Sequence, residues 1–143
     1  MITIVQRVLD EVRAHADEDA PRECCGVLIG RQGDILECAR ALNLAEGTTR
    51  FRLNPPDHIR AMREARERTM DVIGFYHSHP RSRAYPSETD VAESGYAGAM
   101  HLIAGEGESS QEMRLFVIDG ANVEELRYQV IEDERGGGPL AGC

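Results

Sequence analysis

Apolar residues recur near the N-terminus at the spacing of one helical face, which predicts a first helix. The segment Thr3-x-x-Gln6 has the form of a capping box, in which two side chains bond the first backbone amides of a helix. Pro21 bars the helix from continuing, since proline has no amide hydrogen. The apolar positions of this face are Val5, Val8, Leu9, Val12 and Ala16. His15 is expected on the exposed face of the helix.

The rest of the chain alternates strand-like apolar runs with two further helical segments. Strands are predicted over residues 25–29, 35–39, 49–53, 72–79, 100–104, 113–119 and 124–131. A second helix is predicted from Asn54 to about Thr69, with Pro55 in a tolerated first-turn position, and a short third helix from Ser87 to about Tyr96. This order predicts a mixed β-sheet flanked by helices, in the α/β (α+β) class.

Length and composition predict one domain, residues 1–131, followed by a disordered C-terminal tail, residues 132–143. Acidic residues number 25 against 16 basic ones, and the formal net charge of −9 argues against nucleic acid and anionic lipid as partners. The chain has no apolar run of membrane-spanning length and no signal-peptide pattern at its start, so we expect a cytoplasmic protein and no membrane partner. The sequence leaves the oligomeric state open.

The segment with the most chemical content begins at the end of the apolar strand 72–79, with His77-Ser78-His79-Pro80. Residues two apart on a strand point to the same face, so both imidazoles can reach one ion while Ser78 points away into the core. Asp90 would complete a set of two imidazoles and one carboxylate. Such a set leaves the fourth position of a tetrahedral zinc open, as in catalytic rather than structural sites.

Each part of this segment also has a structural interpretation. Histidines at the end of a strand are commonly hydrogen-bonded residues of the surface or the core. Ser87-x-x-Asp90 has the form of a helix N-terminus, with Ser87 as the cap and an acidic residue three positions later. The capping and metal-binding interpretations are compatible, because a cap fixes where the first helical turn directs its side chains.

The complete pattern, His77-x-His79, seven further residues and Ser87-x-x-Asp90, resembles the signature of the JAMM (MPN-plus) zinc metalloproteases. The segment from Glu23 to Gly30 resembles the upstream part of that signature, a glutamate followed by a glycine and an apolar stretch. The resemblance covers nearly the whole chain, and the compact length is similar to that of the small prokaryotic members. It implies the JAMM/MPN fold, which is related to the fold of cytidine deaminase.

The resemblance also implies a cofactor, a mechanism and a substrate class. Zn²⁺ would be held by His77, His79 and Asp90, with Glu23 as the general base and then the acid, and Ser87 as a donor to the oxyanion. The substrate would be the peptide or isopeptide bond after the C-terminal Gly-Gly tail of a ubiquitin-like or sulfur-carrier protein. Release of cysteine from a sulfur-carrier protein, an activity among small bacterial relatives, is the preferred subclass.

Two other functions remain as alternatives. Some MPN domains lack the metal residues and act as non-catalytic scaffolds, and the intact set of five residues argues against this role here. Zinc deaminases have a related fold but use a Cys-x-x-Cys pair, which the four cysteines of this chain do not form. His58 and His101 are expected to be structural or surface residues rather than ligands.

Overall fold

The computed structural model describes residues 1–45, 50–93 and 98–133. Within these residues the chain forms an eight-stranded mixed sheet with the strand order β7-β6-β5-β4-β2-β3-β1-β8. The strands are β1 (Ile2–Val5), β2 (Cys25–Arg31), β3 (Asp34–Ala41), β4 (Asp71–Arg83), β5 (Met100–Glu106), β6 (Gln111–Asp119), β7 (Asn122–Leu126) and β8 (Tyr128–Ile131). The helices are α1 (Gln6–Asp19), α2 (Pro55–Glu67) and α3 (Glu88–Glu93). The predicted mixed sheet flanked by helices is confirmed.

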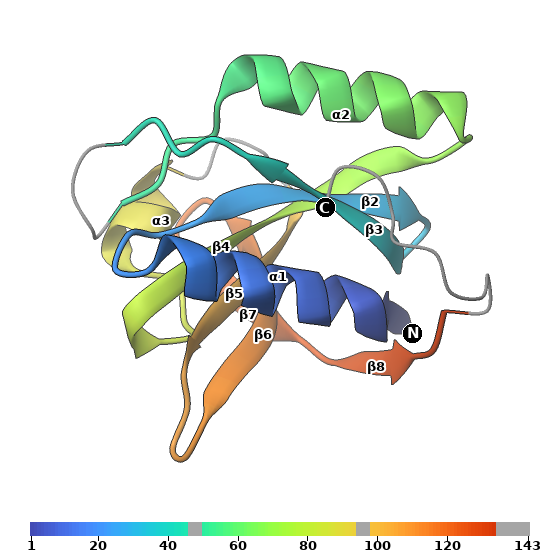
Figure 1. The fold of residues 1–143 in the computed structure, drawn as a ribbon. Helices are drawn as coiled ribbons and strands as arrows, with labels where there is room; N and C mark the ends of the chain where they lie inside the picture. The colour runs from blue at the N-terminus through green and yellow to red at the C-terminus, as the bar shows by residue number, and fades with distance from the viewer. Residues whose placement is uncertain (46–49, 94–97, 134–143) are drawn as a thin grey trace.

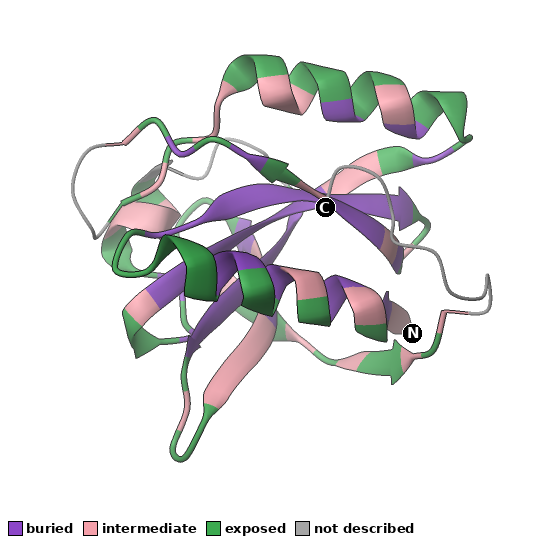
Figure 2. Ribbon diagram, in the orientation of Figure 1, coloured by how far each residue is buried: buried purple, intermediate pink, exposed green. Residues whose placement is uncertain are grey.

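Helices α1 and α2 lie on opposite sides of the β2–β3–β4 part of the sheet (Figure 1). On a strand, successive side chains face opposite ways, and the two apolar clusters follow this alternation. Leu28 and Tyr76 pack with Val8 and Val12 of α1, among others. The other face packs on α2 through Val27, Ile29, Ala61, Ala65, Met70 and Phe75. The strands between the helices are therefore buried on both faces, as Figure 2 shows.

Strand β4 runs through the middle of the sheet, antiparallel to β2 and parallel to β5. The register places Cys25 of β2 beside His77. Next to this pair, Gly26 lets the Tyr76 ring and the Ala39 carbonyl pack closely against the backbone of β2. A Cβ atom at this position would lie 2.2 Å from the ring and 2.4 Å from the carbonyl oxygen. The glycine that follows Glu23 in the sequence motif is thus required by packing beside the site.

The start of the first helix differs from the prediction. Thr3 is not a helix cap but part of β1, where its hydroxyl donates to Asp34 Oδ1 at 2.7 Å, and α1 begins at Gln6 after Val5, without a side-chain cap. Pairing of β1 with β3 and β8, which are distant in sequence, outweighs the local capping pattern. His15 was expected on the exposed face of α1, but it is buried. Its Nδ1 lies 2.7 Å from the Tyr76 hydroxyl, at hydrogen-bond distance.

Two predicted strands also differ. Of the segment 49–53, Thr49 lies outside the described residues, and residues 50–53 contain a single bridge, from Leu53 to Asn43, rather than a strand. The predicted strand 124–131 is two strands, β7 and β8, which separate at Arg127 and lie at opposite ends of the sheet.

The outer limits of the domain stay predictions. Helix α3 ends at Glu93 within the described residues, and the rest of its predicted range, up to Tyr96, lies outside them. Most of the predicted tail, residues 134–143, also lies outside, while Asp133 forms an ion pair with Arg7. Among the helices of the described residues, none has the length and apolar character needed to cross a membrane.

Candidate metal centre

His77 and His79 face the same way from β4 and are buried, with exposed fractions of 1% and 5%. Their Nε2 atoms lie 3.1 Å apart. Ser78 between them points to the other face, where its Oγ accepts a hydrogen bond from the Cys24 amide at 2.8 Å and its own amide donates to the Cys24 carbonyl. The alternation of a strand thus brings the two imidazoles together, and Ser78 braces β4 against the segment that precedes β2.

Asp90 reaches the same point from the first turn of α3. Its Oδ2 lies 3.1 Å from His77 Nε2 and 3.1 Å from His79 Nε2. The same oxygen accepts a hydrogen bond from the Ser87 amide at 2.9 Å, and the Asp90 amide donates to Ser87 Oγ at 3.0 Å. The capping and ligand-like arrangements therefore occur together in one turn.

The three atoms, two imidazole nitrogens and one carboxylate oxygen, form a triangle with sides of 3.1 Å. Zinc ligands stand about 2.0–2.1 Å from the metal, and the edge of such a tetrahedron is about 3.3 Å. His79 Nδ1 lies 2.8 Å from the Arg83 carbonyl oxygen, which can only accept, so Nδ1 carries the proton and Nε2 of the neutral ring presents its lone pair to the site. Both the donor set and its spacing fit a zinc ion.

Electrostatics of the triangle also suit a cation. Burial lowers the pKa of His77, so this ring favours its neutral, ligand-competent form. Burial acts to raise the pKa of Asp90, but hydrogen bonds with His77 and His79 outweigh it and hold that pKa well below its usual range. For His79, burial is outweighed by bonds to Asp90 and to Arg83, and the pKa is raised, so in the metal-free protein a proton competes with a metal ion for the Nε2 lone pair. Asp90 thus supplies a permanent negative charge at the centre of the site.

Glu23 is the fourth member of the cluster. One ligand atom from each of Glu23, His77, His79 and Asp90 lies within 4.8 Å of the others. Glu23 is 5% exposed, and its Oε1 has no hydrogen-bond partner within the described part of the chain. Burial raises the pKa of Glu23 from 4.5 to about 7, although nearby His79 acts to lower it. A carboxyl group with a pKa near neutrality can both accept and return a proton at physiological pH.

The five residues singled out from the sequence meet at this site, with Ser87 present as the cap of α3. Neither His58 nor His101 belongs to the cluster. His101 is buried, and burial lowers its pKa to about 4, which agrees with a structural role. His58 lies against Phe75 with an interplanar angle of 83°.

Sequence reasoning missed two neighbours of the site. The Phe51 ring stacks on the His77 ring, with centroids 4.3 Å apart and an interplanar angle of 22°. Asn43 is buried and donates from Nδ2 to the Glu23 carbonyl at 2.8 Å. Phe51 fell inside a segment predicted as a strand, and no local pattern marks an asparagine whose partners lie up to twenty residues away.

Fold and site together define a class: a mixed α+β domain whose central strand and one helical turn place two imidazoles and a carboxylate around one point, beside a buried glutamate. Residues 5–119 match the family of prokaryotic homologs of the JAB domain. The chain belongs to this family, and the family and fold predicted from the sequence are confirmed.

Relatives and solved structures agree with this assignment. The chain is 32% identical to a desampylase of Haloferax volcanii over 99 residues. The matched segment covers 67% of this chain and 71% of the relative. It is 32% identical over 129 residues to the CysO-cysteine peptidase of Mycobacterium tuberculosis strain H37Rv, covering 87% of this chain and 88% of the relative. The solution structure of a protein from Desulfitobacterium hafniense superposes with a TM-score of 0.86 at 27% identity, covering 95% of this chain and 97% of that one.

Proposed function

We propose that this protein is a zinc-dependent metallopeptidase or isopeptidase. It hydrolyses the bond after the C-terminal Gly-Gly of a ubiquitin-like or sulfur-carrier protein. The observation that carries the proposal is the buried Glu23 carboxyl beside the triangle of His77, His79 and Asp90. Relatives that are a desampylase and a CysO-cysteine peptidase support a substrate in which a small protein is joined to another group.

Each of the five residues has a role in this chemistry. His77, His79 and Asp90 hold the zinc, which when bound supplies a Lewis acid and an acidified water. Glu23 accepts a proton from the attacking water and returns it to the departing amine, and its buried carboxyl lies beside the ligand atoms, where both transfers take place. Ser87 Oγ already accepts a bond from the Asp90 amide, so its hydroxyl hydrogen can be donated to the developing oxyanion.

The surface charge of the chain, as well as its relatives, indicates what kind of substrate protein it binds. A single activated water gives hydrolysis without selectivity, so the binding energy has to come from the folded part of the substrate protein. The net charge of −9 favours a partner with basic patches near its tail. We propose the cytoplasm as the location, on the sequence pattern given above, and fractionation of expressing cells tests it.

The direct test is incubation of the zinc-loaded protein with small folded proteins whose Gly-Gly tail is extended by a peptide, by cysteine or through an isopeptide bond. Intact-mass analysis should show cleavage immediately after Gly-Gly, with the rate falling as salt is added. The same fusions with Gly-Gly replaced by a bulkier pair, and unfolded casein, should remain intact. General proteolysis, or no cleavage of any fusion by protein shown to contain zinc, would contradict the proposal and favour the non-catalytic scaffold.

A further inference from the structure

The side chain of Asn43 joins two parts of the chain that face the metal centre. Its Oδ1 accepts hydrogen bonds from the amides of Ala45 at 2.9 Å and Arg52 at 2.8 Å. Its Nδ2 donates to the carbonyl oxygens of Glu23 at 2.8 Å and Arg50 at 3.2 Å. All four partners are backbone groups, which fixes the orientation of the amide, because an N–H can only donate and a carbonyl can only accept.

Arg50 and Arg52, which Asn43 holds, are the residues on either side of Phe51. A further bond from the Leu44 amide to the Arg52 carbonyl at 2.8 Å, and the bridge between Asn43 and Leu53, keep this segment beside the end of β3. The Phe51 ring is thereby placed in its stack on the His77 ring, at a centroid distance of 4.3 Å. The Asn43 side chain thus contributes two of the hydrogen bonds that hold Phe51 against His77.

The two histidines are oriented in different ways. His79 is fixed by the hydrogen bond between its Nδ1 and the Arg83 carbonyl. His77 Nδ1 is buried and has no hydrogen-bond partner within residues 1–45, 50–93 and 98–133. Metal-bound imidazoles are normally oriented by a partner at the second nitrogen. The His77 imidazole is instead stacked against the Phe51 ring.

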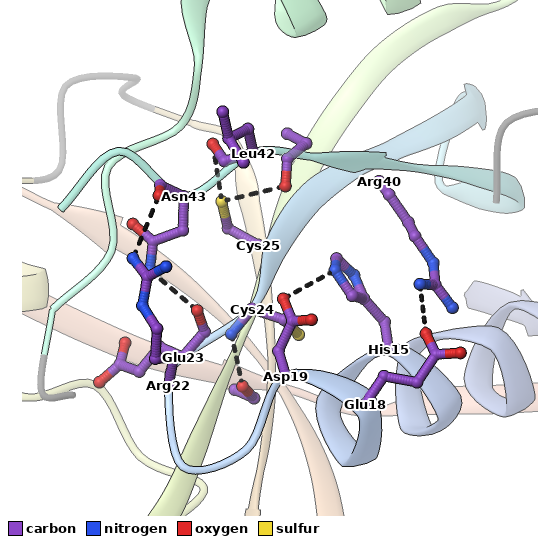
Figure 3. A network of polar contacts seen from close by, with 12 residues as sticks. His15, Glu18, Asp19, Arg22, Glu23, Cys24, Cys25, Arg40, Leu42 and Asn43 are labelled. Atoms are coloured by element: carbon purple, nitrogen blue, oxygen red, sulfur yellow. Dashed lines mark hydrogen bonds and ion pairs between the residues drawn. The ribbon is translucent and has the colours of Figure 1, made fainter. Parts of the chain in front are cut away.

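The Asn43 side chain also holds the backbone of Glu23 through its Nδ2. Its bond to the Glu23 carbonyl is followed along the chain by two hydrogen bonds of Cys24, whose amide donates to Ser78 Oγ and whose carbonyl accepts from the Ser78 amide. Three consecutive backbone groups, starting with the Glu23 carbonyl, are therefore held by hydrogen bonds. Figure 3 shows Asn43 beside Glu23 and Arg22, with Arg22 donating to the carbonyl oxygen of Asn43. The buried Glu23 carboxyl is therefore carried by a backbone that Asn43 helps to fix.

We propose that Asn43 and Phe51 form one positioning unit, in which Phe51 sets the direction of the His77 imidazole and Asn43 holds both Phe51 and the backbone of Glu23 in place. This inference rests on the proposed function, because it assigns residues that act through the metal ligand and the general base. It accounts for a buried asparagine at this position. Aspartate has the same size but would place an oxygen against two carbonyl oxygens, where asparagine donates two hydrogen bonds.

The first experiment compares Asn43→Asp with Asn122→Asp, an exposed substitution of the same kind at the start of β7. Zinc affinity is measured by competition with a chelating dye, and kcat and KM are measured separately on a Gly-Gly fusion. We expect Asn43→Asp to lower zinc affinity or kcat by about 10- to 100-fold with little change in KM, and Asn122→Asp to leave all three unchanged. A folded Asn43→Asp protein with parental affinity and kcat would overturn the proposal.

A second pair of variants tests the ring itself and does not depend on whether Asn43→Asp folds. Phe51→Leu removes the flat face, whereas Phe51→Tyr retains it. The d–d absorption of the Co²⁺-substituted protein reports the ligand geometry. We expect Phe51→Leu to change this spectrum and weaken metal binding by about tenfold or more, and Phe51→Tyr to restore both to within about twofold. Equal spectra and affinities in both variants would overturn the role of the stacked ring.

The double variant Asn43→Asp with Phe51→Leu shows whether the two residues act as one unit. If they do, its loss of metal affinity should be no larger than that of the more severe single variant, and multiplicative losses would overturn the coupling. Metal affinity and the Co²⁺ spectrum are measured without substrate. If the parent protein binds zinc but cleaves no conjugate, the proposed function fails while these two measurements still decide the positioning role.

Discussion

Ser87 and Asp90 exchange two hydrogen bonds across the first turn of α3, from the Ser87 amide to Asp90 Oδ2 at 2.9 Å and from the Asp90 amide to Ser87 Oγ at 3.0 Å. Asp90 Oδ2 also faces both imidazoles. A carboxylate that is held by a backbone amide loses little freedom when it binds a metal, so the cap prepares the ligand. One four-residue turn therefore serves helix formation and metal binding together.

Replacing His77 with alanine should abolish stoichiometric zinc binding, because one imidazole and one carboxylate would remain to hold the ion. Elemental analysis of the purified protein after dialysis measures this directly. His58→Ala is the matched control, since His58 lies outside the cluster and should leave zinc content unchanged. The metal-free parent should stay folded but become less stable, as the metal binds the native state alone. Undiminished zinc in His77→Ala would rule out the site.

Replacing Glu23 with glutamine should leave zinc content and fold intact while removing nearly all turnover. Glutamine keeps the size of the side chain but cannot accept the proton of the attacking water. Single-turnover cleavage of a Gly-Gly fusion is the measurement. Glu18→Gln, a change of the same kind in an exposed residue of α1, should retain the parental rate. A Glu23→Gln rate within a fewfold of the parent would show that the mechanism is wrong.

Replacing Ser87 with alanine should have two effects of different size. Loss of the cap should lower the free energy of unfolding by about 1 kcal/mol, which urea denaturation measures. Loss of the oxyanion donor should lower kcat by about 100- to 1,000-fold. Ser87→Gly provides the comparison, because glycine is a tolerated cap but donates no side-chain hydrogen bond. If both variants retain the parental kcat, Ser87 is a cap without a role in the chemistry.

The stability of the metal-free protein should depend on pH through Glu23. Its pKa is about 7 in the folded state against an ordinary value of 4.5, so the folded state binds this proton more tightly than the unfolded state. The stabilisation is fully present below pH 4.5 and is lost as the pH rises to about 7. Glu23→Gln lacks this titration and should become progressively more stable than the parent across that window.

Urea unfolding in the presence of a chelator, at intervals from pH 4.5 to 8, measures that difference. Bound zinc should weaken the dependence, because a nearby cation favours the ionised carboxylate. A difference between the two metal-free proteins that does not change with pH would contradict the raised pKa of Glu23.

The sequence predicted the residues whose positions follow from local geometry. His77 and His79 share a face because any strand has a two-residue period, and Asp90 follows a capping serine at the spacing that starts a helix. The family resemblance added Glu23, whose place beside the histidines depends on how the chain returns from α1 to β2. Nothing in the charged segment around Glu23 predicts its burial.

What the sequence missed depends on contacts distant along the chain. His15 lies one turn from Val12 on the inner face of α1, and its partner is Tyr76, sixty-one positions later. Thr3 fits a capping box, yet strand pairing with Asp34 and Gln129 places it in a sheet. The roles of Asn43 and Phe51 could not be predicted for the same reason. Their contacts at the site, with Glu23 and His77, join residues that are distant in the sequence and are brought together by the fold.

Arg127 alone separates β7 from β8, although these strands lie at opposite ends of the strand order. The Tyr128 hydroxyl, from β8, donates to the Met113 carbonyl of β6 at 2.7 Å, which links the edge strand at one end of the order to the second strand at the other end. We therefore expect opening at one end of the sheet to loosen the other, so that amide protons of β8 and β6 exchange with deuterium at similar rates. β4, three strands from one margin and four from the other, would be the last to open.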